Sequence, residues 1–129
     1  TKNRAVTLQA QQEITMGIQS EVALAAKPNV VENLSPESRA TILRYFGEYH
    51  DTRDEGTLWH IDYVKWYSTT YEDLIALYKD LEENHDEEDY LIVEACYDYP
   101  EHQGEGDIGE WHDNPWQLHR QVRVSLYIH

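Results

Sequence analysis

Histidines and carboxylates that could bind a metal ion gather in one stretch of the chain. Residues 101–113 contain His102, Asp107 and His112 together with further acids, and imidazole and carboxylate groups are ligand types of zinc and other divalent ions. Their spacing matches no His-Glu-x-x-His motif, no cysteine pair and no calcium loop. We therefore predict no bound metal and no cofactor, and these three residues are the weak candidates for a site.

Catalytic chemistry has less support still. Cys96 is the single cysteine; it could pair with a histidine, but it stands in an apolar, strand-like run where a packed, inert thiol is usual. The sequence has no glycine-rich phosphate loop and no nucleophile elbow. We expect a protein that is not an enzyme. A single cysteine also excludes an internal disulfide, which favours a reducing compartment and a cytoplasmic protein.

Negative charge is concentrated in one part of the sequence. Of the formal charge of −15, residues 48–113 contribute −18, from 21 acids and three bases, whereas residues 1–47 and 114–129 are slightly positive. Such a charge would be repelled by bare nucleic acid and by anionic membranes. No apolar run is long enough for a membrane-spanning helix. The asymmetry favours a charged binding face for a basic protein, and a merely solvated surface is the plain alternative.

Carboxylates spaced along a strand or helix could replace phosphates. Outward residues two apart on a strand lie about 7 Å from each other, close to the phosphate spacing of one DNA strand. We predict a water-facing row on one helix and one strand, continued in the following loop. Its members are Glu72, Asp73, Asp80, Glu83, Glu94, Asp98, Glu105, Asp107 and Glu110.

Aromatic residues are interleaved with these acids. Tyrosine and tryptophan are favoured anchors of protein interfaces, and acids beside aromatic rings suit a partner rich in arginine and lysine. We expect most rings to belong to the core. Trp111 and Trp116 stand in or beside a polar loop, and both are predicted to contact a partner.

The elements that must position these residues are predicted from periodicity and capping signals. We expect a single small α+β domain over residues 1–129, with order ααβαββ and an antiparallel sheet packed against helices. Residues 1–34, a helix and a linker, could be peripheral to it. The predicted segments are helix 8–26, linker 28–34, helix 35–49, a charged turn at 50–56, strand 58–67, helix 71–84, strand 90–99, loop 101–115 and strand 118–128.

In composition the chain is similar in kind to small acidic inhibitors carried by phages and mobile elements, which include nucleic-acid mimics and blockers of bacterial defence nucleases of anti-CRISPR or anti-restriction type. It is equally similar to acidic immunity proteins that neutralise toxin nucleases. The resemblance covers no alignable motif and transfers no residue. It implies an inhibitor of a basic nucleic-acid-binding protein, acting in the host cytoplasm if phage-encoded.

Two other classes of function stay open. One is a metal-dependent enzyme or metal-binding protein that uses the 101–113 loop. The other is a structural or assembly protein that forms oligomers through the first helix.

Overall fold

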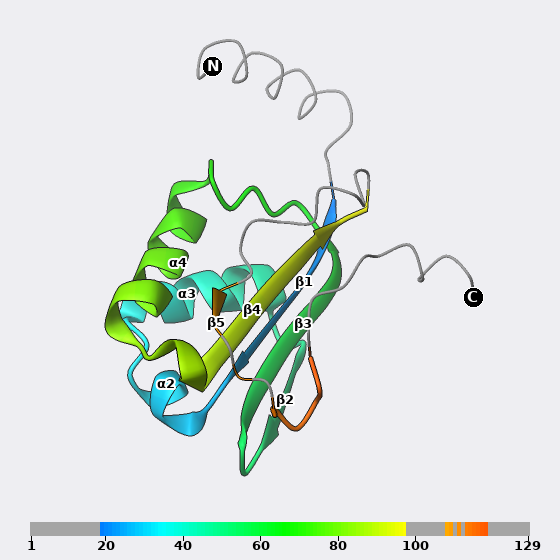
Figure 1. Ribbon diagram of the computed structural model, residues 1–129. Coiled ribbons are helices and arrows are strands. Elements are labelled where there is room, and N and C mark those ends of the chain that lie inside the picture. Colours follow the sequence, from blue (N-terminus) through cyan, green and yellow to red (C-terminus); the bar gives the residue numbers. More distant parts are fainter. Residues whose placement is uncertain (1–18, 98–107, 110, 112, 119–129) are drawn as a thin grey trace, which may run out of the picture.

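The computed structural model describes residues 19–97, 108–109, 111 and 113–118, and within them it shows a five-stranded antiparallel sheet with strand order β2-β3-β1-β4-β5. The elements are β1 (Ser20–Ala26), α2 (Pro28–Glu32), α3 (Pro36–Phe46), β2 (His50–Arg53), β3 (Gly56–Val64), α4 (Glu72–Asn84), the 3₁₀ helix η1 (Glu87–Asp89), β4 (Tyr90–Cys96) and β5 (Ile108–Gly109). The helices pack on one side of the sheet (Figure 1). The predicted class, an antiparallel sheet packed against helices, is confirmed, and the predicted order roughly matches.

The central strand β1 occupies residues that the sequence pattern assigned to the first helix. From Ser20 to Ala26 that prediction is wrong, and residues 8–18 lie outside the described part of the chain. β1 pairs with β3 on one side and with β4 on the other. A strand buried on both faces is a continuous apolar run without alternation, and its alanines favour a helix locally. Tertiary pairing therefore decides the conformation here.

Helix α3 begins where the sequence predicts and ends at Phe46, three residues before the predicted end at Tyr49. The Ser35 hydroxyl accepts a hydrogen bond of 3.0 Å from the backbone N–H three residues on, which satisfies one of the free donors of the first turn. Gly47 ends the helix with a φ of 60°, a conformation that side chains disfavour. The short α2 forms where the linker 28–34 was predicted.

The main core lies between the helices and the sheet. Leu43 of α3 and Ile75 of α4 are 66% and 44% exposed although both are apolar, whereas Leu77 of α4 is buried. The face that each helix turns to the core therefore does not include all of its large apolar residues. The buried members of this core are Val22, Leu24, Ala26, Val30, Leu34, Ile42, Phe46, Trp66, Leu74, Leu77, Leu81, Tyr90 and Ile92.

Residues predicted as a charged turn form most of a β-hairpin. β2 covers the first half of the predicted turn at 50–56, and β3 starts two residues before the predicted strand 58–67. Gly56 lies directly against the backbone of β1: a Cβ added to it would stand 2.3 Å from the carbonyl oxygen of Ala26. Only glycine permits this close approach.

The opposite face of the sheet carries a smaller apolar cluster of Ala23, Ala25, Leu91, Val93 and Trp111. Trp111, which was predicted to contact a partner, is only 6% exposed. Small alanine side chains on β1 leave room for its indole ring in this cluster.

The last strand, predicted at 118–128, lies outside the described residues except for its first residue. Within the described ranges, no helix is both long and apolar enough to cross a membrane.

Candidate functional site

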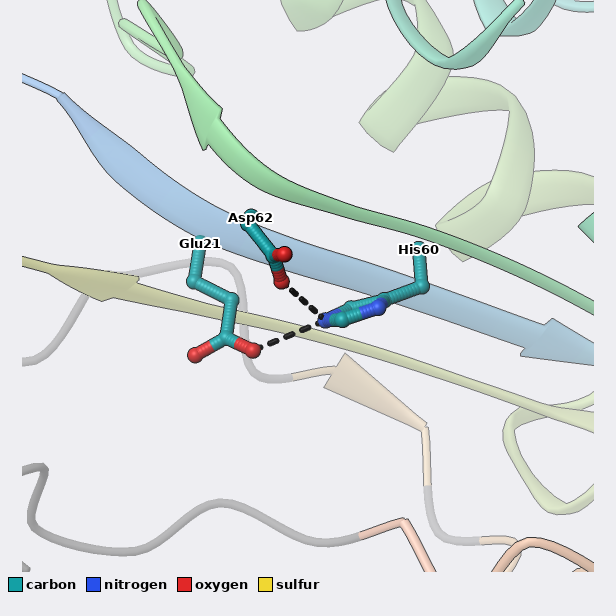
Figure 2. A group of neighbouring side chains, drawn as sticks. All are labelled: Glu21, His60 and Asp62. Atoms are coloured by element: carbon teal, nitrogen blue, oxygen red, sulfur yellow. Dashed lines mark hydrogen bonds and ion pairs between the residues drawn. The ribbon is translucent and has the colours of Figure 1, made fainter. Parts of the chain in front are cut away.

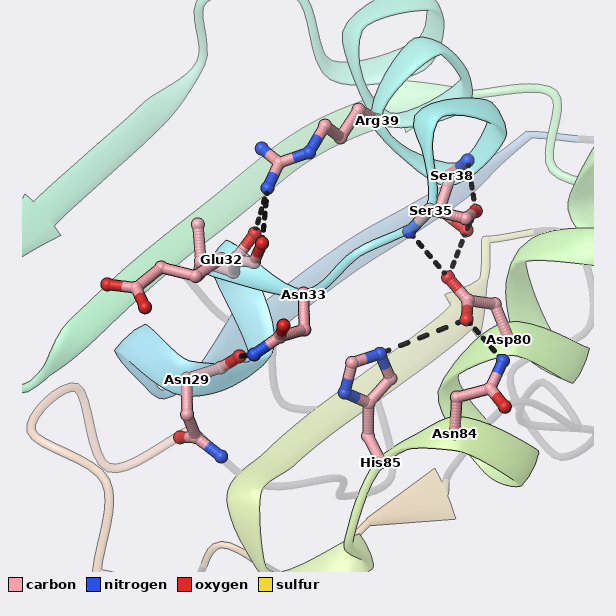
Figure 3. Close-up of polar contacts among 10 residues, drawn as sticks. Asn29, Glu32, Asn33, Ser35, Ser38, Arg39, Asp80, Asn84 and His85 are labelled. Atoms are coloured by element: carbon pink, nitrogen blue, oxygen red, sulfur yellow. Dashed lines mark hydrogen bonds and ion pairs between the residues drawn. The ribbon is translucent and has the colours of Figure 1, made fainter.

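Asp80, predicted to face water, is 8% exposed and lies between α3 and α4. Its Oδ2 accepts hydrogen bonds from the Ser38 hydroxyl at 2.7 Å and from the Ser35 N–H at 3.2 Å, and its Oδ1 accepts one from the Asn84 side chain at 2.7 Å (Figure 3). Burial alone raises the pKa of Asp80, but these hydrogen bonds outweigh it and lower the pKa below the ordinary value. The prediction of exposure is wrong because α4 turns this carboxylate toward the positive N-terminus of α3.

The residues around Asp80 make contacts between helices. The side chain of His85 is 5% exposed, and its Nε2 lies 3.9 Å from Oδ1 of Asp80 without a hydrogen bond. On the other side, Arg39 of α3 donates hydrogen bonds to the carbonyl oxygens of Val31 and Glu32 (Figure 3). The hydrogen bonds of Asp80 connect α4 with the start of α3, and those of Arg39 connect α3 with α2.

Glu94 is the second predicted surface acid that the structure buries, at 7% exposure. It stands on β4 on the same side as Tyr90 and Ile92, which face the helices. The Tyr78 hydroxyl donates a hydrogen bond of 2.7 Å to Glu94, and the Trp66 indole donates one of 3.0 Å to Tyr78. The alternation of β4 was predicted correctly, but the face taken as outward is covered by α4.

Of the remaining predicted acids, the three that the structure describes, Glu72, Asp73 and Glu83, do not form a continuous row. Glu72 and Glu83 are exposed at opposite ends of α4. Asp73 binds Arg44 and accepts a hydrogen bond from the Tyr45 hydroxyl. Burial, followed by the hydrogen bond and charge of Asp73, raises the pKa of Tyr45 to about 12. Asp98, Glu105, Asp107 and Glu110 lie outside the described residues.

The structure instead gathers exposed carboxylates at one end of α4. We call this surface the acidic end; it consists of Glu82, Glu83, Asp86, Glu87 and Glu88, all of them exposed. The last turn of α4 holds no basic residue. Negative side chains there face the negative end of the helix dipole, which disfavours them. Among the described residues, only the Asp86 side chain of this group accepts a hydrogen bond, from the backbone N–H of Glu88 in η1.

Neighbouring residues show how far this negative charge extends. Burial, followed by the charges of Glu82 and Glu87, raises the pKa of Tyr90 to about 12. Asp89, which follows the acidic end in sequence, is neutralised by Lys27 at 3.2 Å and accepts a hydrogen bond from Asn29 at 3.0 Å. The hydrogen bond from Asn29 is the largest of the effects that lower the pKa of Asp89. The unneutralised negative charge of the acidic end therefore stops at Asp89, beside α2.

Trp116 keeps part of its surface accessible, as a partner-binding residue would require. Its indole N–H donates a hydrogen bond of 2.9 Å to Asp51, and the Arg53 guanidinium lies 5.1 Å from the ring centre. The hydrogen bond from Trp116 contributes most to lowering the pKa of Asp51. Beside Trp111, the ring also covers the smaller apolar cluster.

A second group of polar side chains lies on the sheet face that carries this smaller cluster (Figure 2). His60 Nε2 is 2.7 Å from an oxygen of Glu21 and 3.4 Å from an oxygen of Asp62. A cavity of about 330 Å³ adjoins the group and is lined by Tyr49, His60, Ile61, Asp62 and Tyr63. Sequence reasoning did not find this group, because 39 residues separate Glu21 from His60.

The metal candidates His102, Asp107 and His112 lie outside the described residues. Comparisons of the chain with protein-family models, with curated proteins and with solved structures found no match. Function must therefore be argued from the residues themselves.

Proposed function

We propose that this protein is an acidic protein-binding inhibitor that blocks a basic nucleic-acid-binding protein or nuclease by presenting carboxylates in place of phosphates. The observation that carries the proposal is the acidic end, where five exposed carboxylates occur within seven consecutive positions, from Glu82 to Glu88. Such a surface competes for a basic groove by the same electrostatics that bind nucleic acid there.

Solubility alone does not explain the acidic end. Without its five carboxylates the formal charge of −15 would still be −10, which is ample for a domain of this size. Mutual repulsion and the unfavourable helix dipole both oppose folding at this place. A charge arrangement that lowers stability without improving solubility favours a role in binding.

The test compares two variants that carry the same number of Glu→Gln changes. The acidic-end variant is Glu82→Gln, Glu83→Gln, Glu87→Gln and Glu88→Gln, and it keeps Asp86 because that side chain caps η1. The control variant changes four exposed glutamates elsewhere. These are Glu32→Gln, Glu37→Gln, Glu48→Gln and Glu55→Gln.

The wild-type protein is first used to capture its partner from a bacterial lysate, with identification by mass spectrometry. We expect a basic nucleic-acid-binding protein whose association slows about tenfold or more with the acidic-end variant, because long-range attraction sets the encounter rate. The control variant should associate like the wild type. Equal association rates for the two variants, or a partner without a basic surface, would contradict the proposal.

A further inference from the structure

The antiparallel pairing of β1 with β3 places three metal-ligand side chains on one face of the sheet. Ser20 pairs with Val64 and Val22 pairs with Ile61, so Glu21 stands opposite two residues of β3, Asp62 and Tyr63. His60 and Asp62 are two residues apart on β3 and share one face, and Glu21 lies on the face of Ala23, which pairs with His60. The result is a group from two adjacent strands, which are more rigid supports than loops.

The geometry of the group fits a single cation. One ligand atom from each of Glu21, His60 and Asp62 lies within 4.8 Å of the others, and the three side chains point toward one another (Figure 2). Zinc binds nitrogen and oxygen ligands tetrahedrally at about 2.0–2.2 Å, which sets the ligand atoms roughly 3.3–3.6 Å apart. Asp62 is already at such a separation from His60 Nε2, at 3.4 Å, whereas Glu21, at 2.7 Å, has to move back by less than about 1 Å to admit the cation.

Charge and access fit as well. Two carboxylates and one neutral imidazole carry a charge of −2, which balances a divalent cation. The side chain of His60 is 43% exposed and that of Asp62 is 78% exposed, so a cation can enter from solvent. Glu21 is more enclosed, at 22%. The cavity beside the group leaves room for water or a small ligand at the remaining coordination positions.

From these observations we infer that Glu21, His60 and Asp62 form a binding site for a divalent transition-metal cation of the zinc class. The site is separate from the acidic end. Glu21 stands near the start of β1, whereas Ala26, at its other end, pairs with Tyr90 beside η1. Five residues along a strand span about 17 Å. The inference therefore does not depend on the proposed inhibition.

The test is zinc binding by the full chain, measured by isothermal titration calorimetry. We expect saturable 1:1 binding, and His60→Gln, Glu21→Gln and Asp62→Asn should each weaken it by about tenfold or more, since even outer-shell changes cost 10–100-fold. The matched control is His50→Gln, an exposed histidine on the neighbouring strand β2, which should bind zinc like the wild type. Zinc should also raise the melting temperature of the wild type by about 5 °C or more at saturation.

Three results would overturn the inference. One is the absence of saturable binding. Another is binding that the three variants leave unchanged. The third is binding lost only in His102→Gln or His112→Gln, which would place the metal in the 101–113 loop. A measurement on the unmodified protein guards against variants that fail to fold: added Mn²⁺ should broaden the NMR amide signals of Glu21 and Asp62 before those of the acidic end, and the opposite order would contradict the site.

Discussion

Asp80 accepts hydrogen bonds from Ser35, Ser38 and Asn84, and Glu94 accepts one from the Tyr78 hydroxyl. Both carboxylates are almost fully buried, where an ionised group without partners would be strongly destabilising. Their hydrogen bonds connect α3 with α4 and α4 with β4. At the scale of single residues, these two acids stabilise the fold and are not available to a partner.

The ionised form of Asp80 should make stability depend on pH. Because the folded-state pKa is lowered, its contribution is full above the unfolded-state pKa of about 3.9 and is lost as the pH falls from there through the lower folded-state pKa. We expect Asp80→Asn to lower the free energy of unfolding by about 1–3 kcal/mol at pH 7. The difference from wild type should shrink below about pH 4, since a protonated carboxyl resembles an amide.

Urea unfolding at several pH values measures this difference. The control is Glu83→Gln, an exposed acid of the same helix, which should have little effect at any pH. A difference between Asp80→Asn and wild type that stays constant down to pH 2 would show that Asp80 does not act through its ionised form.

At the scale of the elements, the sequence predicts those whose local signals agree with the fold. The Ser35 cap and the apolar stripe locate α3, and the strand pattern after Asp89 locates β4. β1 could not be found in this way, because its apolar run, buried on both faces, has no period of its own. The sequence also does not show which face of a strand is covered. Glu94 lies on the same face of β4 as Tyr90 and Ile92, as the alternation predicts, but only the packing of α4 shows that this face is buried.

The junction between β1 and β3 should be sensitive to a single methyl group. In Gly56→Ala the new Cβ would overlap the carbonyl oxygen of Ala26, which belongs to the backbone and cannot move aside without displacing β1. Gly47→Ala is the matched control: its φ of 60° is also unfavourable, but nothing lies within 4 Å of the added atom. It should cost about 1–3 kcal/mol from backbone strain.

We expect Gly56→Ala to lower the free energy of unfolding by at least about 1 kcal/mol more than Gly47→Ala, the cost of overpacking. Urea titrations of both variants measure this. Equal losses would mean that β1 and β3 can separate at this point without cost.

At the scale of the whole molecule, the sequence reveals the sign of the charge but not its geometry. The excess of acids in residues 48–113 is plain, and yet burial removes Asp80 and Glu94 from the surface, while Arg44 binds Asp73. The grouping of Glu21 with His60 depends on the register of β1 against β3, which no local pattern specifies. Among the described residues, the carboxylates of the acidic end are exposed and follow one another closely in sequence.

The acidic end should therefore destabilise the isolated protein at low salt. We expect the acidic-end variant to melt at a higher temperature than wild type at low ionic strength, because neutral side chains remove both the mutual repulsion and the clash with the dipole of α4. In about 1 M salt the Debye length falls to about 3 Å, so the difference should largely disappear.

The control variant should show no such gain, since Glu37 in the first turn of α3 is favourable where it stands. Melting curves of the three proteins at low and high salt test this without any partner; an equal gain for both variants would mean that repulsion is spread over the surface and the acidic end carries no special cost.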